Sequence, residues 1–297
     1  MMMYLGVLLA LLVGVTLGLL GGGGSILTLP ILLYVFHLPA PTAIATSLLV
    51  VGTTSAVSLV PHGRAGRVAW RTGGLFGLAS MGGAFVGGRV SSHLPSALLL
   101  VAFGAMMAFT ARAMLRGRRA PSGGAGEATL ARVVLQGVGV GLVTGLLGAG
   151  GGFLVVPALV LLGGLSMPRA VATSLFVIAM NSAAALVGHL GHAQIPWAIA
   201  APVTLAAALG SVVGYGLSAR LSAEVLRRGF AALVAVMAVF VLGQELPRLA
   251  GHPLALGQHW PGLAAAMLGA LGFVLSRPRV EAATQGAGLH VPSASPR

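Results

Sequence analysis

The hydrophobic pattern consists of long, uninterrupted apolar runs separated by short polar segments. The runs occupy residues 4–36, 41–60, 70–90, 95–115, 130–163, 168–187, 196–216, 224–244 and 261–276. A helix needs about 20 apolar residues to cross the hydrocarbon core of a bilayer. The period-two alternation of membrane barrel strands is missing. The pattern therefore predicts an all-α, polytopic integral membrane protein.

Two of these runs are too long for one crossing and are interrupted by glycine. Residues 21–24 break the run 4–36, and residues 148–152 break the run 130–163. Glycine is unfavourable inside a helix, so such a cluster ends it. We expect each long run to form either one broken, tilted helix or a hairpin of two short helices.

The chain also contains an internal duplication. Shifting it by 127 positions aligns it with itself without a gap, and 24 of the 57 residues from Gly14 to Trp70 are then identical to their counterparts. Internal repeats in a membrane protein are typical of secondary transporters, whose binding site lies at the repeat interface. The predicted organisation is repeat 1 (4–115), a cytoplasmic linker (116–129), repeat 2 (130–244), an extra transmembrane helix (261–276) and a disordered tail (277–297).

Composition and charge support membrane insertion and predict an orientation. The chain is 57% hydrophobic and 7% charged, whereas soluble domains carry about 25% charged residues. Its 17 arginines lie in short loops between apolar runs. They are therefore expected to set topology beside the lipid bilayer rather than to bind nucleic acid. An oligomer is possible.

The arginines distinguish the two forms of the long runs. If each run crosses once, the arginines divide 9 to 8 between the two sides. If each run is a hairpin, 15 arginines fall on one side and only Arg89 and Arg248 on the other. The positive-inside rule favours the second division. It predicts inverted repeats, an outside N-terminus, and a cytoplasmic linker and C-terminus.

The glycine breaks are the first candidate site. Irregular backbone at membrane depth is tolerated where it is buried in protein or lines a cavity. The N–H groups that open the following half-helices would favour an anion. Close helix packing through small residues is the alternative. The candidate residues are Gly22, Gly23, Gly24, Ser25, Gly150, Gly151 and Gly152.

A second candidate is the motif Pro-x-Ala-x-Ala-Thr-Ser, which occurs at 41–47 and again at 168–174. Proline suits the first turn of a helix, which places its Thr-Ser pair one to two turns inside. These hydroxyls either donate to a bound oxyanion or bond back to helix carbonyls. Asn181 follows the second motif where Thr54 follows the first, so it would make the site asymmetric. The paired hydroxyls belong to Thr46, Ser47, Thr173 and Ser174.

The remaining polar residues limit the chemistry. His62 and His189 match by repeat, and they could couple transport to protons or only cap helices. His189 and His192 have no third ligand nearby, so no metal site is expected. All four glutamates fall in loops or at helix ends, which disfavours a cation site deep in a span. The chain has no cysteine or aspartate and no hydrolase motif, so we expect neither an enzyme nor a cofactor.

The repeated motifs resemble those of the TauE/SafE family of bacterial membrane permeases, over about residues 5–245. The resemblance rests on Gly18–Ser25 with Pro30, Ala45–Leu48, Gly145–Gly152 with Pro157, and Ala172–Ser174. It implies a multi-pass protein of the bacterial inner membrane that carries small sulfur-containing or organic anions such as sulfite or sulfonates. We expect alternating access around a midplane site. A non-transporting membrane scaffold or assembly factor and an anion channel are the alternatives.

Overall fold

The computed structural model is all-helical in the part of the chain that it describes. That part comprises residues 2–91, 93–115, 130–147, 152–161, 163–189, 193–218 and 221–249. Several predictions lie outside these residues. They concern the linker 116–129, Gly150 and Gly151, His192, the extra helix 261–276 and the tail 277–297.

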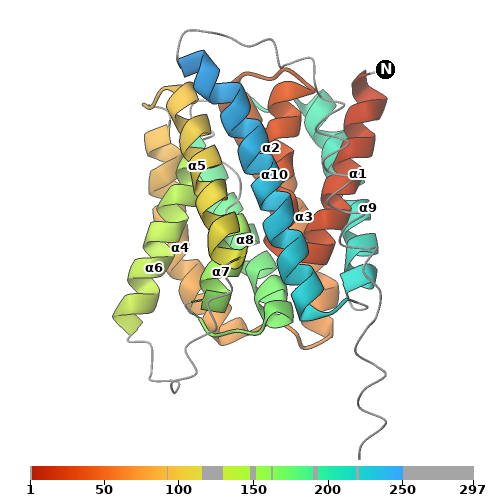
Figure 1. The fold of residues 1–297 in the computed structure, drawn as a ribbon, viewed down its shortest axis with the longest axis vertical. Helices are drawn as coiled ribbons and strands as arrows, with labels where there is room; N and C mark the ends of the chain where they lie inside the picture. Colours follow the sequence, from red (N-terminus) through yellow and green to blue (C-terminus); the bar gives the residue numbers. More distant parts are fainter. Residues whose placement is uncertain are drawn as a thin grey trace, which may run out of the picture.

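The helices of the two halves follow the same order and spacing (Figure 1). The first half contains α1 (Met2–Leu20), the short 3-10 helix η1 (Gly21–Gly24), α2 (Ser25–Tyr34), α3 (Ala40–Arg64), α4 (Trp70–Ser91) and α5 (Ser96–Leu115). The second half contains α6 (Leu130–Leu147), α7 (Gly152–Leu161), α8 (Met167–His189), α9 (Trp197–Ser218) and α10 (Ala223–Leu249). The starts of α7, α8, α9 and α10 each follow those of α2, α3, α4 and α5 by 127 residues. The sequence repeat is therefore also a repeat of helix positions.

The first long run forms a hairpin. It breaks at η1, and α2 then returns beside α1. A Cβ on Gly6, near the start of α1, would fall 2.0 Å from the ring of Phe36, which follows α2. The segment 4–36 therefore leaves on the side where it enters.

Equivalent helices of the two halves run in opposite directions. In Figure 1, α5 descends and α10 ascends beside it. A Cβ on Gly104 would lie 2.8 Å from the Leu242 side chain, while the Arg227 guanidinium donates to the Met114 carbonyl over 3.3 Å. The two helices are thus antiparallel, while the inverted arrangement of the whole repeats stays a prediction.

The two halves are interlocked by glycine contacts. α1 packs along α9, and α4 packs along α6. A Cβ on Gly18 would fall 2.0 Å from the Ser211 carbonyl oxygen, and one on Gly145 would fall 2.1 Å from the Ala84 carbonyl oxygen. Only glycine allows such close backbone approach between membrane helices. The equivalent helices α3 and α8 pack against each other between these pairs.

The described arginines gather at one end of the bundle. They lie at the ends of α3, α5, α8, α4 and α10 that meet at the lower end of Figure 1, namely Arg64, Arg67, Arg71, Arg112, Arg169, Arg227 and Arg228. Arg89 lies at the other end of α4. We call the lower end the Arg-rich end. Trp70 and Trp197 open α4 and α9 and are 52% and 63% exposed, which suits the membrane-interface role of tryptophan.

Five described helices are long and apolar enough to cross a membrane. They are α3, α5, α8, α9 and residues 224–247 of α10, with mean hydropathies of 1.7–2.1. The observed α3 and α10 extend beyond the apolar runs 41–60 and 224–244, because polar turns such as Pro61–Arg64 continue the helix. The chain is therefore a multi-pass membrane protein.

Candidate functional site

The two glycine breaks meet at the interface between the repeats. A Cβ on Gly22 would fall 1.9 Å from the Gly152 carbonyl oxygen. A Cβ on Gly152 would fall 2.3 Å from the Gly22 Cα and 2.7 Å from the Ser25 hydroxyl oxygen. The beginnings of α2 and α7 are therefore in contact, as expected if both breaks contribute to one site.

The electrostatics of this junction depend on two helix N-termini. A helix N-terminus carries roughly half a positive charge, and the starts of α2 and α7 lie together, with the Ser25 N–H donating to the Gly22 carbonyl. The described carboxylates lie elsewhere. Glu224 pairs with Arg227 and Arg228 at an exposed helix start, and Glu245 bonds to Tyr34. Among the described residues, no acidic side chain is thus seen to neutralise the junction.

The second Thr-Ser motif lies beside the first break. Gly21 adopts a left-handed φ of +67°, which favours glycine. A Cβ at this position would meet the Val171 carbonyl oxygen at 2.9 Å and the Ser174 hydroxyl at 3.0 Å. The structure therefore brings Gly21, Gly22, Gly152 and Ser174 together, and Gly23 and Gly24 lie in the same 3-10 turn.

The serine hydroxyls of the candidate site bond back to their own helices. Ser25 donates to the Gly22 carbonyl over 2.7 Å. Ser47 and Ser174 each donate to the carbonyl three residues earlier, both over 2.8 Å. The protons of these three hydroxyls are therefore donated to nearby backbone carbonyls, which is the alternative to donation to a bound anion. The hydroxyl oxygens of Ser174 and Ser25 lie beside the junction, next to Gly21 and Gly152 respectively.

The two threonines of the motif differ. Thr173 accepts a hydrogen bond from the Ala69 N–H over 2.9 Å, just before α4 begins. Thr46 is fully buried, and its hydroxyl has no hydrogen-bond partner within the described ranges. The counterpart of Ala69 in repeat 2 is Pro196, which has no N–H to donate. This substitution explains why the equivalent bond is missing.

Asn181 and its counterpart Thr54 have different hydrogen-bond partners. Its side-chain oxygen accepts a 2.6 Å bond from the Ser80 hydroxyl. Its NH2 group is buried and finds no acceptor in the described part of the chain. Thr54, at the matching position of α3, has no partner there either. The amide is therefore a free donor in the apolar interior.

The two matched histidines occupy different environments. The nitrogens of His189 lie 2.9 Å from the Ala185 carbonyl and 2.8 Å from the Ser91 hydroxyl. His62 is 1% exposed. Its ring nitrogens have no bond of good geometry to any described residue, and the ring instead packs edge-on against Tyr215, with centroids 4.7 Å apart. His62 therefore lies in the protein interior rather than at an interface.

Sequence reasoning missed the burial of Glu245. The residue lies near the end of α10, as expected, but it is only 2% exposed. Its carboxylate accepts a 2.6 Å bond from the Tyr34 hydroxyl, and Phe240 packs edge-on against Tyr34. The sequence held no direct signal for this pair, because the two residues are 211 positions apart and the repeat does not match them to each other.

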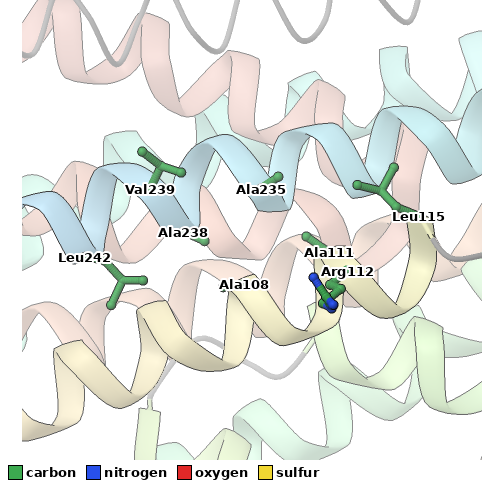
Figure 2. Close-up of a pocket in the computed structure, with 8 residues that line it drawn as sticks. All are labelled: Ala108, Ala111, Arg112, Leu115, Ala235, Ala238, Val239 and Leu242. Atoms are coloured by element: carbon green, nitrogen blue, oxygen red, sulfur yellow. The ribbon is translucent and has the colours of Figure 1, made fainter.

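A groove of about 480 Å³ lies away from these residues, between α5 and α10 (Figure 2). Its walls are alanine, leucine and valine side chains, with Arg112 toward the Arg-rich end. It contains none of the predicted site residues. The groove is therefore an apolar surface feature separate from the glycine junction.

Comparisons with known proteins agree with this architecture. The model of the sulfite exporter TauE/SafE family matches residues 6–241. A probable membrane transporter protein of Xylella fastidiosa is 35% identical over 238 residues, covering 78% of this chain and 91% of that protein. The probable membrane transporter protein YdhB of Bacillus subtilis is 26% identical over 213 residues, covering 70% of this chain and 87% of that protein.

A third relative gives the same result. A probable membrane transporter protein of Methanocaldococcus jannaschii is 28% identical over 253 residues, covering 80% of this chain and 94% of that protein. No solved structure matches the chain significantly. The family match spans both helix repeats and both breaks, and on this ground the chain belongs to the sulfite exporter TauE/SafE family.

Proposed function

We propose that this membrane transporter is a secondary permease for a small sulfur-containing or organic anion such as sulfite or a sulfonate. It binds the anion at the junction of the two glycine breaks and works by alternating access in the bacterial inner membrane. The observation that carries the proposal is the contact between Gly22 and Gly152. It joins two helix N-termini inside an apolar protein.

The chemistry around the junction supports an oxyanion. Helix N-termini offer N–H donors to negatively charged oxygens. The free NH2 group of Asn181 in α8 and the free hydroxyl of Thr46 in α3 would add neutral donors to the site. The relatives' names give the transporter class but no substrate, so sulfur chemistry rests on the family description.

The first experiment measures ligand-induced thermal stabilisation of the purified protein. The panel contains sulfite, sulfate, thiosulfate, taurine, sulfoacetate and carboxylate anions, with metal cations as controls. A ligand that binds only the folded state raises its stability by mass action. A shift confined to a sulfur oxyanion or sulfonate supports the proposal, and a shift with cations alone contradicts it.

Three variants locate the site. Thr46→Val removes an unpaired hydroxyl, and Asn181→Leu removes an unpaired NH2 group together with the oxygen that accepts from Ser80. Each should still fold and should reduce the anion-induced shift at least several-fold. Gly22→Ala should abolish the shift by separating the breaks. Gly82→Ala is its control, because a Cβ there meets no described atom within 4 Å. Unchanged anion binding in Asn181→Leu and Thr46→Val would remove these residues from the site.

Flux into proteoliposomes separates the proposal from its alternatives. A permease should show saturable flux that accelerates when the anion is present on both sides. Flux that rises linearly with concentration would indicate a channel. A folded protein that neither binds nor moves any anion of the panel would favour a scaffold.

A further inference from the structure

A row of four buried polar side chains on one face of α3 has no hydrogen-bond partners. The row consists of Thr54, Ser55, Ser58 and His62, each at most 1% exposed. Spacings of three and four residues place them on one face of the helix. The hydroxyls of Thr54, Ser55 and Ser58 bond to no other group within the described part of the chain, and the imidazole of His62 approaches the Gly18 backbone without a bond of good geometry. We call these residues the α3 row.

The missing bonds set this row apart from many other buried hydroxyls of the protein. Thr16, Ser91 and Thr144, for example, each turn back to a carbonyl of their own helix over 2.8 Å. The hydroxyls of the α3 row are not turned back in this way. A buried polar group without a partner costs about 1–3 kcal/mol. The row is therefore unfavourable in the closed arrangement that the structure shows.

The row runs from the centre of the protein to the Arg-rich end. Its first residues lie near the crossing of α3 and α8, where a Cβ on Gly52 would fall 3.0 Å from the Ser182 Cβ. Ser182 also lacks a partner among the described residues. The row ends at His62, two positions before Arg64. It thus connects the repeat interface with the side where the arginines gather.

An aromatic stack closes this end of the row. The Tyr215 ring of α9 packs edge-on against His62, and the Arg67 guanidinium lies 5.7 Å from the centre of the same ring. In the other half, the side chain of the corresponding histidine, His189, is hydrogen-bonded. Gly88 occupies the position equivalent to Tyr215, and His189 bonds there to the Ser91 hydroxyl. Tyr215 is therefore a specific barrier on the α3 side.

The geometry points to a function for the α3 row that rests on the proposed function. We infer that it lines the path of the anion between the glycine junction and the Arg-rich end. The path opens when α9 separates from α3 and Tyr215 leaves His62. The three hydroxyls and the imidazole then donate to water and to the passing oxyanion, which removes the cost of their burial.

The interface that must open, between α9 and α3, is the less extensive of two equivalent interfaces. α9 packs less extensively on α3 than α4 packs on α8. Since α1 is closely joined to α9 by Gly14, Gly18, Gly210 and Gly214, these two helices would move together. The moving unit is therefore the α1–α9 pair.

Single-cysteine labelling tests the path, because the chain contains no cysteine. Ser58→Cys is the probe, and Ala185→Cys, at the equivalent position of α8, is the matched control. The reagents are two membrane-impermeant methanethiosulfonates, one anionic and one cationic. Ala65→Cys and Ser96→Cys lie at exposed positions of the two opposite ends and report which side each reagent reaches.

The expected result has three parts. Ser58→Cys reacts at least tenfold faster than Ala185→Cys, it does so from the Arg-rich side, and the anionic reagent is preferred. Tyr215→Ala in the same protein increases the rate further. Thermal unfolding confirms that each variant is folded before labelling.

Two results would overturn the inference. Equal, slow labelling of Ser58→Cys and Ala185→Cys, with or without Tyr215→Ala, would show that the row is not a path. Faster reaction with the cationic reagent would show that the path does not select anions. Because labelling needs no substrate, a protein that labels as expected but binds no anion of the thermal panel would contradict the proposed substrate and leave the path supported.

Discussion

The interface between α4 and α8 and the interface between α9 and α3 are equivalent by repeat, yet among the described residues the hydrogen bonds between helices lie at the first. At the first, Ala69 donates to Thr173 and Ser80 donates to Asn181. At the second, the positions of Ala69 and Ser80 hold Pro196 and Ala207, which have no corresponding donors. The two copies of this contact therefore differ in their polar partners.

The difference extends along both helices. Trp70 packs edge-on against Phe176 in the first interface, with centroids 5.3 Å apart. Leu49 replaces the phenylalanine opposite Trp197 in the second. Gly88 admits a bonded His189, whereas Tyr215 covers His62. The α4–α8 interface thus has polar and aromatic contacts that hold the two helices together. The α9–α3 interface lacks these contacts, so its helices can separate more easily.

Disruption of the glycine contacts should affect both halves equally and more than any other change. Gly18→Ala and Gly145→Ala each place a Cβ about 2 Å from a backbone carbonyl oxygen. We expect each to lower the free energy of unfolding by about 3 kcal/mol, the upper part of the range for overpacking. Thermal or denaturant unfolding in detergent measures the effect.

Gly139→Ala is the control for both variants, since a Cβ there meets no described atom within 4 Å. It should leave stability within about 0.5 kcal/mol of the parent protein. A loss in only one of Gly18→Ala and Gly145→Ala would show that the two halves are not packed alike.

Removal of the two equivalent threonine hydroxyls should have opposite consequences. Thr173→Val leaves the half-buried Ala69 N–H without its acceptor and should cost about 1–2 kcal/mol. Thr46→Val removes a hydroxyl that is already unpaired, so it should be neutral or slightly stabilising. Unfolding of the two variants under identical conditions gives the comparison. Equal destabilisation would contradict the difference assigned to Pro196.

Ser80 lies opposite Asn181, and Ala207 occupies the matching position opposite Thr54. Exchanging these two residue types should make the two interfaces more similar in stability. Ser80→Ala should cost about 1 kcal/mol by removing the bond to Asn181. Ala207→Ser offers Thr54 a partner and should stabilise the unliganded protein by up to about 1 kcal/mol. It should also slow transport if α9 must leave α3. Faster transport in Ala207→Ser would be the contrary outcome.

Substitution of the two matching tryptophans, Trp70 and Trp197, should give the smallest difference in stability between the two interfaces. Trp70→Leu loses an aromatic contact that Trp197→Leu does not, because Leu49 stands in place of Phe176. Edge-to-face pairs contribute about 0.5–1.5 kcal/mol beyond their burial. We therefore expect Trp70→Leu to be less stable than Trp197→Leu by about 0.5–1 kcal/mol in the same unfolding assay. A reversed order would indicate that the ring contact contributes little.

The sequence was sufficient to predict helices, repeats and breaks, because these depend on local hydrophobicity and on glycine. The hairpin form of 4–36 followed from the positions of the arginines, which are equally local. It was not sufficient to predict the pairing of Tyr34 with Glu245 or of Tyr215 with His62. Those contacts depend on which helices of opposite repeats face each other. Likewise, the sequence alone does not show that Pro196 leaves Thr46 without a donor. That conclusion requires knowing that α9 packs on α3.

The interlocking of α1 with α9 and of α4 with α6 has a consequence for biogenesis. When the ribosome has completed the first half, the glycine faces of α1 and α4 have no partners, since both partners belong to the second half. The glycine faces of α1 and α4 must therefore contact lipid or the insertion machinery until α6 and α9 have been synthesised and inserted. A first half made alone would find its missing surfaces only in another copy inserted in the opposite orientation.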